Sequence, residues 1–543
     1  MCIIKIILLE SEVTAVAPKV NQLKFGAVLS YASLAIGVVV SLVYTPIMLQ
    51  RLGTQEFGVY NLVLPIVSYL NLLSFGLGST YTRYYSRYRV ADDQEGLARL
   101  NGMFLTIYSI LGTLVLILGL ILAAGMHILL AESELTAGEI ELARTLMYIL
   151  SVNAAVSFPI IVFESNVMVN EQYLFQKLVA IGKTVFNPLV MIPLLLMGCN
   201  SVVMVVVTLI FTVLSGVVNI AYCLKKLNMK FKFGKLDAVP LKEMLSYTFY
   251  IFIGILVDQI NWSMDRIILG FQVGSTAISV YTIGSQLHQY FLTMSNSFSG
   301  LLTPRVHRLV ASGSSDKELT ALFTRIGRLQ FLLLSMILLG FIAVGRAFCV
   351  CWGGGEPFEI SYYIAIALFI PTVVQAIQSL GIEIQRAKNM HRFRSLVYLG
   401  VSLANVAVSI PLGRLFAGLG QEFTAAYGAE FSGAFAGFGC ALGTASAILL
   451  GNIPLMNWYY RKHIGLGIGS FWKSILSMVP GMLIPTAAAL AIAIWAPVRH
   501  SYLDVVLWGI VFVIVYAASV WLFSMNDSEK DIIRVPLKRL LKR

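Results

Sequence analysis

Long apolar stretches alternate with short polar segments along the whole chain. Fourteen of these stretches exceed 20 residues and contain few charged positions. A helix of about 20 apolar residues crosses the hydrocarbon core of a bilayer, which is about 30 Å thick. The pattern therefore predicts an all-α integral membrane protein with fourteen transmembrane helices. The expected spans are 26–49, 58–80, 102–125, 146–168, 178–198, 202–224, 245–268, 277–301, 329–350, 360–383, 396–417, 433–456, 474–496 and 503–524.

The composition indicates lipid rather than water as the solvent of this chain. Of its 543 residues, 58% are hydrophobic and only 12% are charged. A soluble domain has about 25% charged residues, and a single water-bounded core stops growing at about 250–300 residues. A chain this long and this apolar cannot bury its side chains in such a core, so a soluble globular protein is excluded.

The basic residues indicate how the chain is oriented. The net charge is +12, and with both termini on one side of the membrane, 33 of the 39 Lys and Arg residues lie in segments on that side. Cytoplasmic segments of membrane proteins carry such an excess of Lys and Arg. The distribution therefore predicts cytoplasmic termini, and it accounts for the positive charge without a nucleic-acid partner.

A sequence repeat divides most of the chain into two similar halves. Residues 52–88 match residues 273–309 at seven of 37 positions, where average residue usage gives about two or three. A weaker correspondence pairs Glu164 with Glu383 near the ends of the fourth and tenth spans. Both copies cross the membrane in the same direction, which predicts a parallel repeat about an axis along the membrane normal. The identical pairs are Gly53/Gly274, Val59/Val280, Tyr60/Tyr281, Tyr69/Tyr290, Ser74/Ser295, Thr82/Thr303 and Arg87/Arg308.

The repeat predicts two six-helix lobes followed by two extra helices. Two lobes that face each other across a central cavity are the geometry of alternating access, in which one site opens to each side of the membrane in turn. The expected organisation is a cytoplasmic N-terminal segment at 1–24, a first lobe at 25–224, a basic cytoplasmic linker at 225–244, a second lobe at 245–456, the extra helices at 457–524 and a basic cytoplasmic tail at 525–543.

Two stretches carry a resemblance to a known family. They are LQRLGTQEFGVYNLVLPIVSYLNLLSFGLGSTYTRYYS, which begins at Leu49, and MDRIILGFQVGSTAISVYTIGSQL, which begins at Met264. Both resemble the polysaccharide repeat-unit (O-antigen type) flippases of the multidrug/oligosaccharidyl-lipid/polysaccharide exporter superfamily. With the lobe size and helix count included, the resemblance covers most of the chain. Ser279 stands where the first copy has Gly58, a departure that weakens the internal symmetry.

The resemblance implies a secondary transporter of the bacterial plasma membrane. Such flippases move polyprenyl-diphosphate-linked sugars from the inner to the outer leaflet. The implied partners are therefore membrane lipids, the lipid-linked sugar, and the glycosyltransferases and polymerase of the same pathway. The two extra helices resemble those of peptidoglycan-precursor flippases, which makes lipid II the alternative substrate.

Two other functions are less favoured by the sequence. A small-molecule exporter of the same superfamily generally has twelve spans rather than fourteen. A membrane polysaccharide polymerase generally needs a larger outer loop than this chain contains. We find no nucleophile, metal-binding or phosphate-loop motif, so neither an enzyme nor a cofactor is expected.

The chemistry of the implied substrate selects candidate binding residues. A diphosphate with about two negative charges needs cations along its path through the membrane. We predict that Arg83 at the inner end of the second span, Lys183 inside the fifth and Arg266 near the outer end of the seventh bind the substrate. Each also has a plainer interpretation, as a topology anchor, a lysine that reaches back to the interface or a helix-end charge.

Acidic residues in the seventh span are candidates for ion coupling. Asp258, Asn261 and Asp265 lie at i, i+3 and i+7 and therefore share one helix face. An ionisable residue inside a membrane helix is a functional hypothesis by default. We predict that Asp258 either couples transport to H+ or Na+ or acts as a gate partner between the lobes, with Asp265 as a second coupling or gating residue. The alternative for Asp265 is a cap at the outer end of the helix.

Three further charged residues are candidates for gates. Glu164 and Glu383 occupy equivalent inner ends of the fourth and tenth spans, where ion pairs with basic neighbours such as Lys183 or Arg386 can close an inner gate. Arg51 precedes the Leu52–Gly53 pair of the first repeat at the outer side, where an outer gate is possible. For all three, a charge that simply faces water is the alternative.

Overall fold

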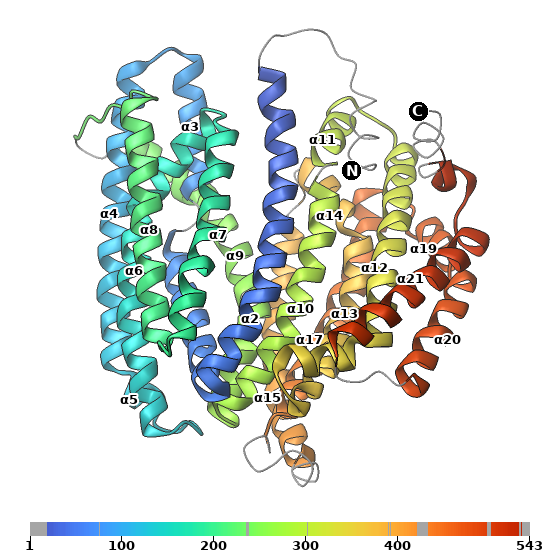
Figure 1. The fold of residues 1–543 in the computed structure, drawn as a ribbon. Coiled ribbons are helices and arrows are strands. Elements are labelled where there is room, and N and C mark those ends of the chain that lie inside the picture. Colours follow the sequence, from blue (N-terminus) through green and yellow to red (C-terminus); the bar gives the residue numbers. More distant parts are fainter. Residues whose placement is uncertain are drawn as a thin grey trace, which may run out of the picture. The chain divides into compact units, whose positions relative to one another are not determined.

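The computed structural model describes residues 19–74, 77–234, 238–300, 302–388, 390, 392–420, 433–496, 501–531 and 534. Every regular element in these ranges is a helix (Figure 1). The predicted all-α class is therefore confirmed. Of the expected cytoplasmic segments, residues 1–18, residues 235–237 of the linker and most of the tail beyond residue 531 lie outside the described residues.

The helices overlap the expected spans, although several of their bounds differ. The long helices and their short connectors are α2 (Lys19–Asn71), η1 (Leu72–Ser74), α3 (Leu77–Val90), α4 (Gln94–Ala124), α5 (Met126–Leu129), α6 (Ala137–Val169), α7 (Tyr173–Leu196), α8 (Ser201–Lys225), α9 (Ala238–Gln272), α10 (Ser275–Gly300), α11 (Thr303–Ala311), α12 (Asp316–Gly353), η2 (Glu356–Glu359), α13 (Ile360–Ile377), α14 (Ser379–Ala387), α15 (Arg392–Gly420), α17 (Ala436–Ser446), η5 (Ala447–Asn452), α18 (Ile453–Tyr459), η6 (Tyr460–Ile464), α19 (Ile468–Leu476), α20 (Pro480–Trp495) and α21 (Tyr502–Phe523).

Ten helices of the described chain are long and apolar enough to cross a membrane, or eleven if the bent pair α19 and α20 forms one span. The expected number is fourteen, and two features account for the three missing spans. Helix α2 runs through two expected spans in one element of 53 residues. Helices α9 and α10 cover two more, but they carry many polar residues and fall outside the ten. The chain is a multi-pass membrane protein.

Paired glycines break the helices at equivalent places in the two repeats. Gly53 interrupts α2 with a φ of 78°, and Gly274 separates α9 from α10 with a φ of 103°. Residues with a Cβ rarely adopt this left-handed conformation, whereas glycine does so at little cost. The repeat therefore encodes the same backbone break twice.

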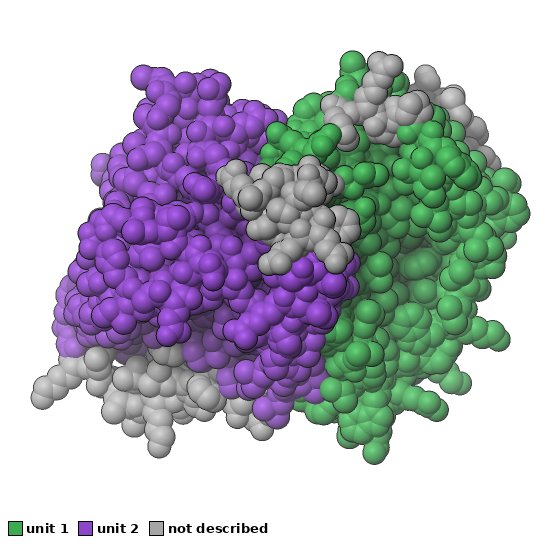
Figure 2. Space-filling model, turned by 90° about the horizontal axis from the view of Figure 1, so that it is seen from below, with its two compact units in different colours: residues 1–18, 283–394, 445–543 green, residues 19–282, 395–444 purple. Residues whose placement is uncertain are grey.

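The described residues group into two compact units, coloured in Figure 2. Unit 1 comprises residues 283–394 and 445–543, and unit 2 comprises residues 19–282 and 395–444. In unit 2, α4, α6 and α8 pack side by side (Figure 1). In unit 1, α12 packs against α13, α20 and α21. The two units do not test the predicted division into six-helix lobes, which stays a prediction.

Candidate functional site

A buried carboxylate in α9 is the centre of a polar cluster in unit 2. Asp265 is only 2% exposed. The Tyr281 hydroxyl, from the first turns of α10, donates to its Oδ2 atom at 2.5 Å. The Thr444 hydroxyl, from α17, donates to the same oxygen at 3.0 Å. Both donors compensate in part for removing a carboxylate from water.

Helix α15 adds a second layer of oxygen atoms to this cluster. Oδ1 of Asn405 accepts a hydrogen bond from the Ser409 hydroxyl at 2.9 Å and lies 3.1 Å from the Thr444 hydroxyl oxygen. Ser409 also lies 3.2 Å from the backbone carbonyl oxygen of Cys440. Asn405, Ser409 and Thr444 are each no more than 1% exposed. We call Asp265, Tyr281, Asn405, Ser409 and Thr444 the Asp265 cluster.

The Asp265 carboxylate has no ion-pair partner among the described residues, although an arginine follows it in sequence. Arg266 interacts with it electrostatically, but the nearest hydrogen bond of this guanidinium is a long one of 3.4 Å to the carbonyl oxygen of Trp262. Its Nε atom is buried and has no hydrogen-bond acceptor within the described ranges. Arg266 therefore keeps donor capacity for an anionic ligand.

The interpretation of Asp265 as a helix-end cap is wrong. Helix α9 continues to Gln272, and the carboxylate bonds to side chains of other helices rather than to terminal backbone groups. Asp258, two turns earlier, is exposed. The residues of the predicted acidic face therefore differ in burial: Asp258 is exposed, Asn261 is half-buried and Asp265 is buried.

Lys183 is held between two neighbouring helices of unit 2. Its ammonium group in α7 donates to the Thr212 hydroxyl in α8 at 3.3 Å. It also acts electrostatically on the Glu164 carboxylate in α6. Lys183 is half-buried, and Glu164 is exposed. A cation, a carboxylate and a hydroxyl thus meet where three membrane helices adjoin.

Arg83 lies on the exposed face of α3. A buried network of side-chain hydrogen bonds anchors the opposite face of this helix. The Tyr81 hydroxyl donates to Asn101 at 2.7 Å and accepts from Asn166 at 2.8 Å. This network holds in place the helix from which Arg83 extends.

The predicted gate residues differ in their surroundings. Arg51 is exposed. Glu383, in α14, pairs with Arg386 at 2.7 Å, three residues further along the same helix. The pair is therefore present, but it links two residues of one helix, and its function as a gate stays a prediction.

Sequence reasoning missed Tyr281, Asn405, Ser409 and Thr444. A signal for two of them was available, because Asn405 and Ser409 are polar residues four positions apart in the apolar stretch 396–417 and therefore share a helix face. Nothing in the sequence indicated that this face meets Asp265. The hydrogen bond that links this cluster to Asp265, from Thr444, joins residues 179 positions apart and depends on tertiary packing.

Residues 26–310 match the model of a protein family described as "Polysaccharide biosynthesis protein". The chain belongs to this polysaccharide biosynthesis protein family. The match covers more than half of the chain, and the resemblance found in the sequence is confirmed at this level. No curated protein matches the chain.

Solved structures show which fold this member of the polysaccharide biosynthesis family adopts. A structure titled "Lipid II flippase MurJ, inward closed conformation" has a TM-score of 0.66 at 15% identity and covers 91% of this chain and 98% of its own. An inward-facing multidrug resistance MATE transporter of the MOP superfamily has a TM-score of 0.63 at 14% identity and covers 82% and 99%. A MOP superfamily transporter from Pyrococcus furiosus has a TM-score of 0.54 at 15% identity and covers 80% and 96%. The chain therefore has the fold of MOP superfamily transporters.

Proposed function

We propose that this protein is a flippase that moves polyprenyl-diphosphate-linked oligosaccharides or polysaccharide repeat units from the inner to the outer leaflet by alternating access. The observation that carries the proposal is the family match over residues 26–310 in a chain with a transporter fold. A polysaccharide pathway needs such a step, because sugars assembled on a lipid carrier in the cytoplasm must cross the membrane. On this proposal the protein is not an enzyme.

The cations of unit 2 support a substrate that carries a diphosphate. Lys183 is held by a neutral hydroxyl and faces a carboxylate that an incoming anion can replace. Arg266 has a buried Nε atom without an acceptor in the described chain. Arginine offers several N–H donors in a planar fork that matches phosphate oxygens. We propose that Lys183, Arg266 and Arg83 contact the diphosphate at successive stages of transport.

The Asp265 cluster supports ion coupling at a site other than the one first expected. It offers carboxylate, hydroxyl and amide oxygen atoms from four helices, the ligand type that hard cations prefer. A proton or Na+ on Asp265 would neutralise a buried charge that has no ion-pair partner among the described residues. We therefore propose Asp265 as the coupling residue, with exposed Asp258 as the second candidate.

A depletion experiment tests the transport proposal. When the protein is depleted from cells, labelled lipid-linked repeat units are expected to accumulate on the inner leaflet, while lipid II is still translocated. Normal export of the repeat units after depletion would refute the proposal. Accumulation of lipid II instead would establish the second candidate, a peptidoglycan-precursor flippase. This candidate is favoured by the larger share of the chain that the lipid II flippase structure covers, 91% against 82% for the MATE transporter.

Substitution tests the coupling proposal separately. Asp265→Asn keeps the shape of the side chain and removes its charge. Transport by this variant is expected to lose its dependence on pH or on Na+, whereas Asp258→Asn keeps it. If Asp258→Asn loses this dependence and Asp265→Asn keeps it, the coupling residue is Asp258.

In the cell, we propose that the protein lies in the bacterial plasma membrane with both termini in the cytoplasm. We propose glycosyltransferases and a polymerase of the same pathway as its partners.

A further inference from the structure

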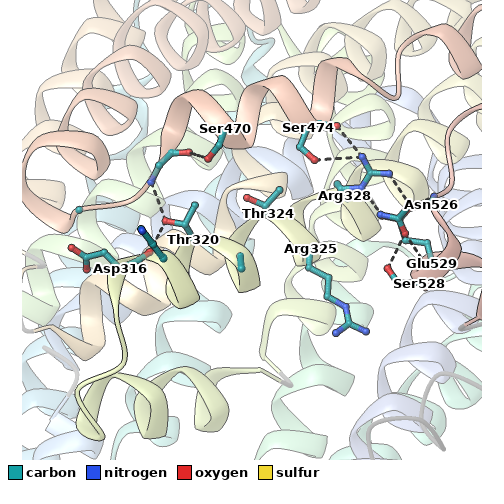
Figure 3. Close-up of a pocket in the computed structure, with 14 residues that line it drawn as sticks. Asp316, Thr320, Thr324, Arg325, Arg328, Ser470, Ser474, Asn526, Ser528 and Glu529 are labelled. Carbon is teal, nitrogen blue, oxygen red and sulfur yellow. Dashed lines mark hydrogen bonds and ion pairs between the residues drawn. The ribbon is translucent and has the colours of Figure 1, made fainter.

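Unit 1 contains a polar cavity that the transport proposal does not use. It has a volume of about 700 Å³ and lies between the first turns of α12, the Gly465–Gly467 connection, α19 and the residues that follow α21. Figure 3 shows its lining side chains. The backbone N–H of Gly467 donates to the Thr320 hydroxyl at 3.0 Å, which closes one end of the cavity.

One face of α12 supplies most of the charge in the cavity. Lys317, Thr320, Thr324 and Arg328 lie at i, i+3, i+7 and i+11 and line it together, with Arg325 beside them. These spacings place the side chains along one stripe of an α-helix. The stripe therefore presents three cations and two hydroxyls to a single cavity.

The two carboxylates of the cavity already have partners. Both carboxylate oxygens of Glu529 accept from Arg328, at 2.5 and 2.8 Å, in a bidentate pair at one end of the cavity. Asp316 pairs with Lys388 at 2.9 Å at the other end. By contrast, Lys317 and Arg325 make no ion pair within the described chain, and the Thr324 hydroxyl makes no hydrogen bond there. The groups that remain for a ligand are cationic or hydrogen-bond donors.

The charge pattern of α12 places this cavity at the depth of lipid headgroups. No charged residue occurs between Arg328 and Arg346, a run of 17 residues. At 1.5 Å per residue this run is roughly 26 Å long, close to the hydrocarbon thickness of about 30 Å. Arg328 therefore marks one hydrocarbon boundary, and Arg325 lies about one turn beyond it, where lipid phosphates are found.

We propose that the cavity binds a phosphate ester anion through Arg325, Thr324 and Lys317, and that the anion is the headgroup phosphate of an anionic membrane lipid. Guanidinium and hydroxyl groups form charge-assisted hydrogen bonds with phosphate oxygens. Because the cavity joins α12, α19 and the segment after α21, the bound headgroup fastens the C-terminal helices to α12. This inference does not depend on the transported substrate.

The test uses the full-length protein purified in detergent. Its thermal-unfolding midpoint is measured against phosphatidylglycerol, phosphatidylcholine and inorganic phosphate at constant ionic strength, and native mass spectrometry counts the retained lipid. The variants are Arg325→Gln and Lys317→Gln, alone and combined. Lys473→Gln is the matched control, since Lys473 is an exposed cation of α19 that does not line the cavity.

We expect phosphatidylglycerol to raise the midpoint of the unsubstituted protein and of Lys473→Gln. The Arg325→Gln variant should need about tenfold more lipid for the same rise, as expected when one charge-assisted contact is lost. If inorganic phosphate alone produces the Arg325-dependent rise, the phosphate site is supported and the lipid assignment is overturned. Equal stabilisation and equal lipid retention in all variants would overturn the proposal entirely.

Discussion

The Ser279 hydroxyl donates a hydrogen bond to the backbone carbonyl oxygen of Thr54, so the two copies of the sequence repeat contact each other directly. The equivalent positions with the two copies exchanged are also in close contact. A Cβ at Gly58, the equivalent of Ser279, would overlap the carbonyl of Ser275, the equivalent of Thr54. The departure from internal symmetry at this position therefore has a structural reason. One copy needs a hydroxyl as donor, and the other needs the close approach that only glycine allows.

This contact predicts that Gly58→Ala destabilises the protein. The added methyl group meets backbone rather than a flexible side chain, so overpacking should cost about 1–3 kcal/mol. Thermal unfolding in detergent measures the effect. Gly254→Ala in α9 is the control, because no heavy atom lies within 4 Å of a Cβ placed there. Equal midpoints for the two variants would show that α2 and α10 do not pack this closely.

The Asp265 cluster predicts a coupling defect in Tyr281→Phe. The substitution removes the 2.5 Å hydrogen bond from the Tyr281 hydroxyl to Asp265 and leaves the aromatic ring in place. The concentration of H+ or Na+ that gives half-maximal transport should shift several-fold, with little loss of folded protein. Proteoliposome transport over a range of pH and Na+ measures it. Tyr362→Phe, whose hydroxyl donates to a backbone carbonyl in unit 1, should leave the ion dependence unchanged.

The cluster of Lys183, Thr212 and Glu164 predicts different outcomes for its members. Lys183→Gln should lower transport of a diphosphate-linked sugar at least tenfold, because it removes a charge-assisted contact in a low-dielectric region. Thr212→Val should have a smaller effect, since the ammonium group stays. Transport assays at several substrate concentrations separate binding from turnover. Unchanged transport in Lys183→Gln would indicate that Lys183 does not bind the substrate and that its side chain only places the charge at the membrane–water interface.

The buried ion pair in unit 1 predicts a large loss of stability in Glu529→Ala. Arg328 is 8% exposed and Glu529 is 2% exposed, so the substitution leaves a buried guanidinium without its counter-ion. Breaking such a pair typically costs about 3–5 kcal/mol. The thermal-unfolding midpoint should fall clearly. Glu95→Ala provides the control, because its pairs with Arg99 and Lys232 are exposed and should contribute little.

Much of the candidate site was visible in the sequence, but its arrangement was not. Lys183 and Arg266 were identifiable because a cation inside an apolar stretch is costly without a function or a partner. Their actual neighbours, Thr212 and the Asp265 cluster, come from other helices. Asp258 and Asp265 looked equivalent in one helix, and only the packing of α10, α15 and α17 shows that one is exposed and the other buried.

The sequence by itself determined the class of the protein, its membrane helices, the direction of the repeat and its family resemblance. These properties are local or compositional, since a bilayer requires about 20 apolar residues in each span and the backbone break at Gly53 and Gly274 needs no distant partner. The tertiary structure decided which polar groups meet. Asp265 with Thr444, Ser279 with Thr54, and Arg328 with Glu529 are contacts between helices far apart in sequence. A polar group without a partner is costly inside apolar surroundings, and the helix packing selects which partner it meets.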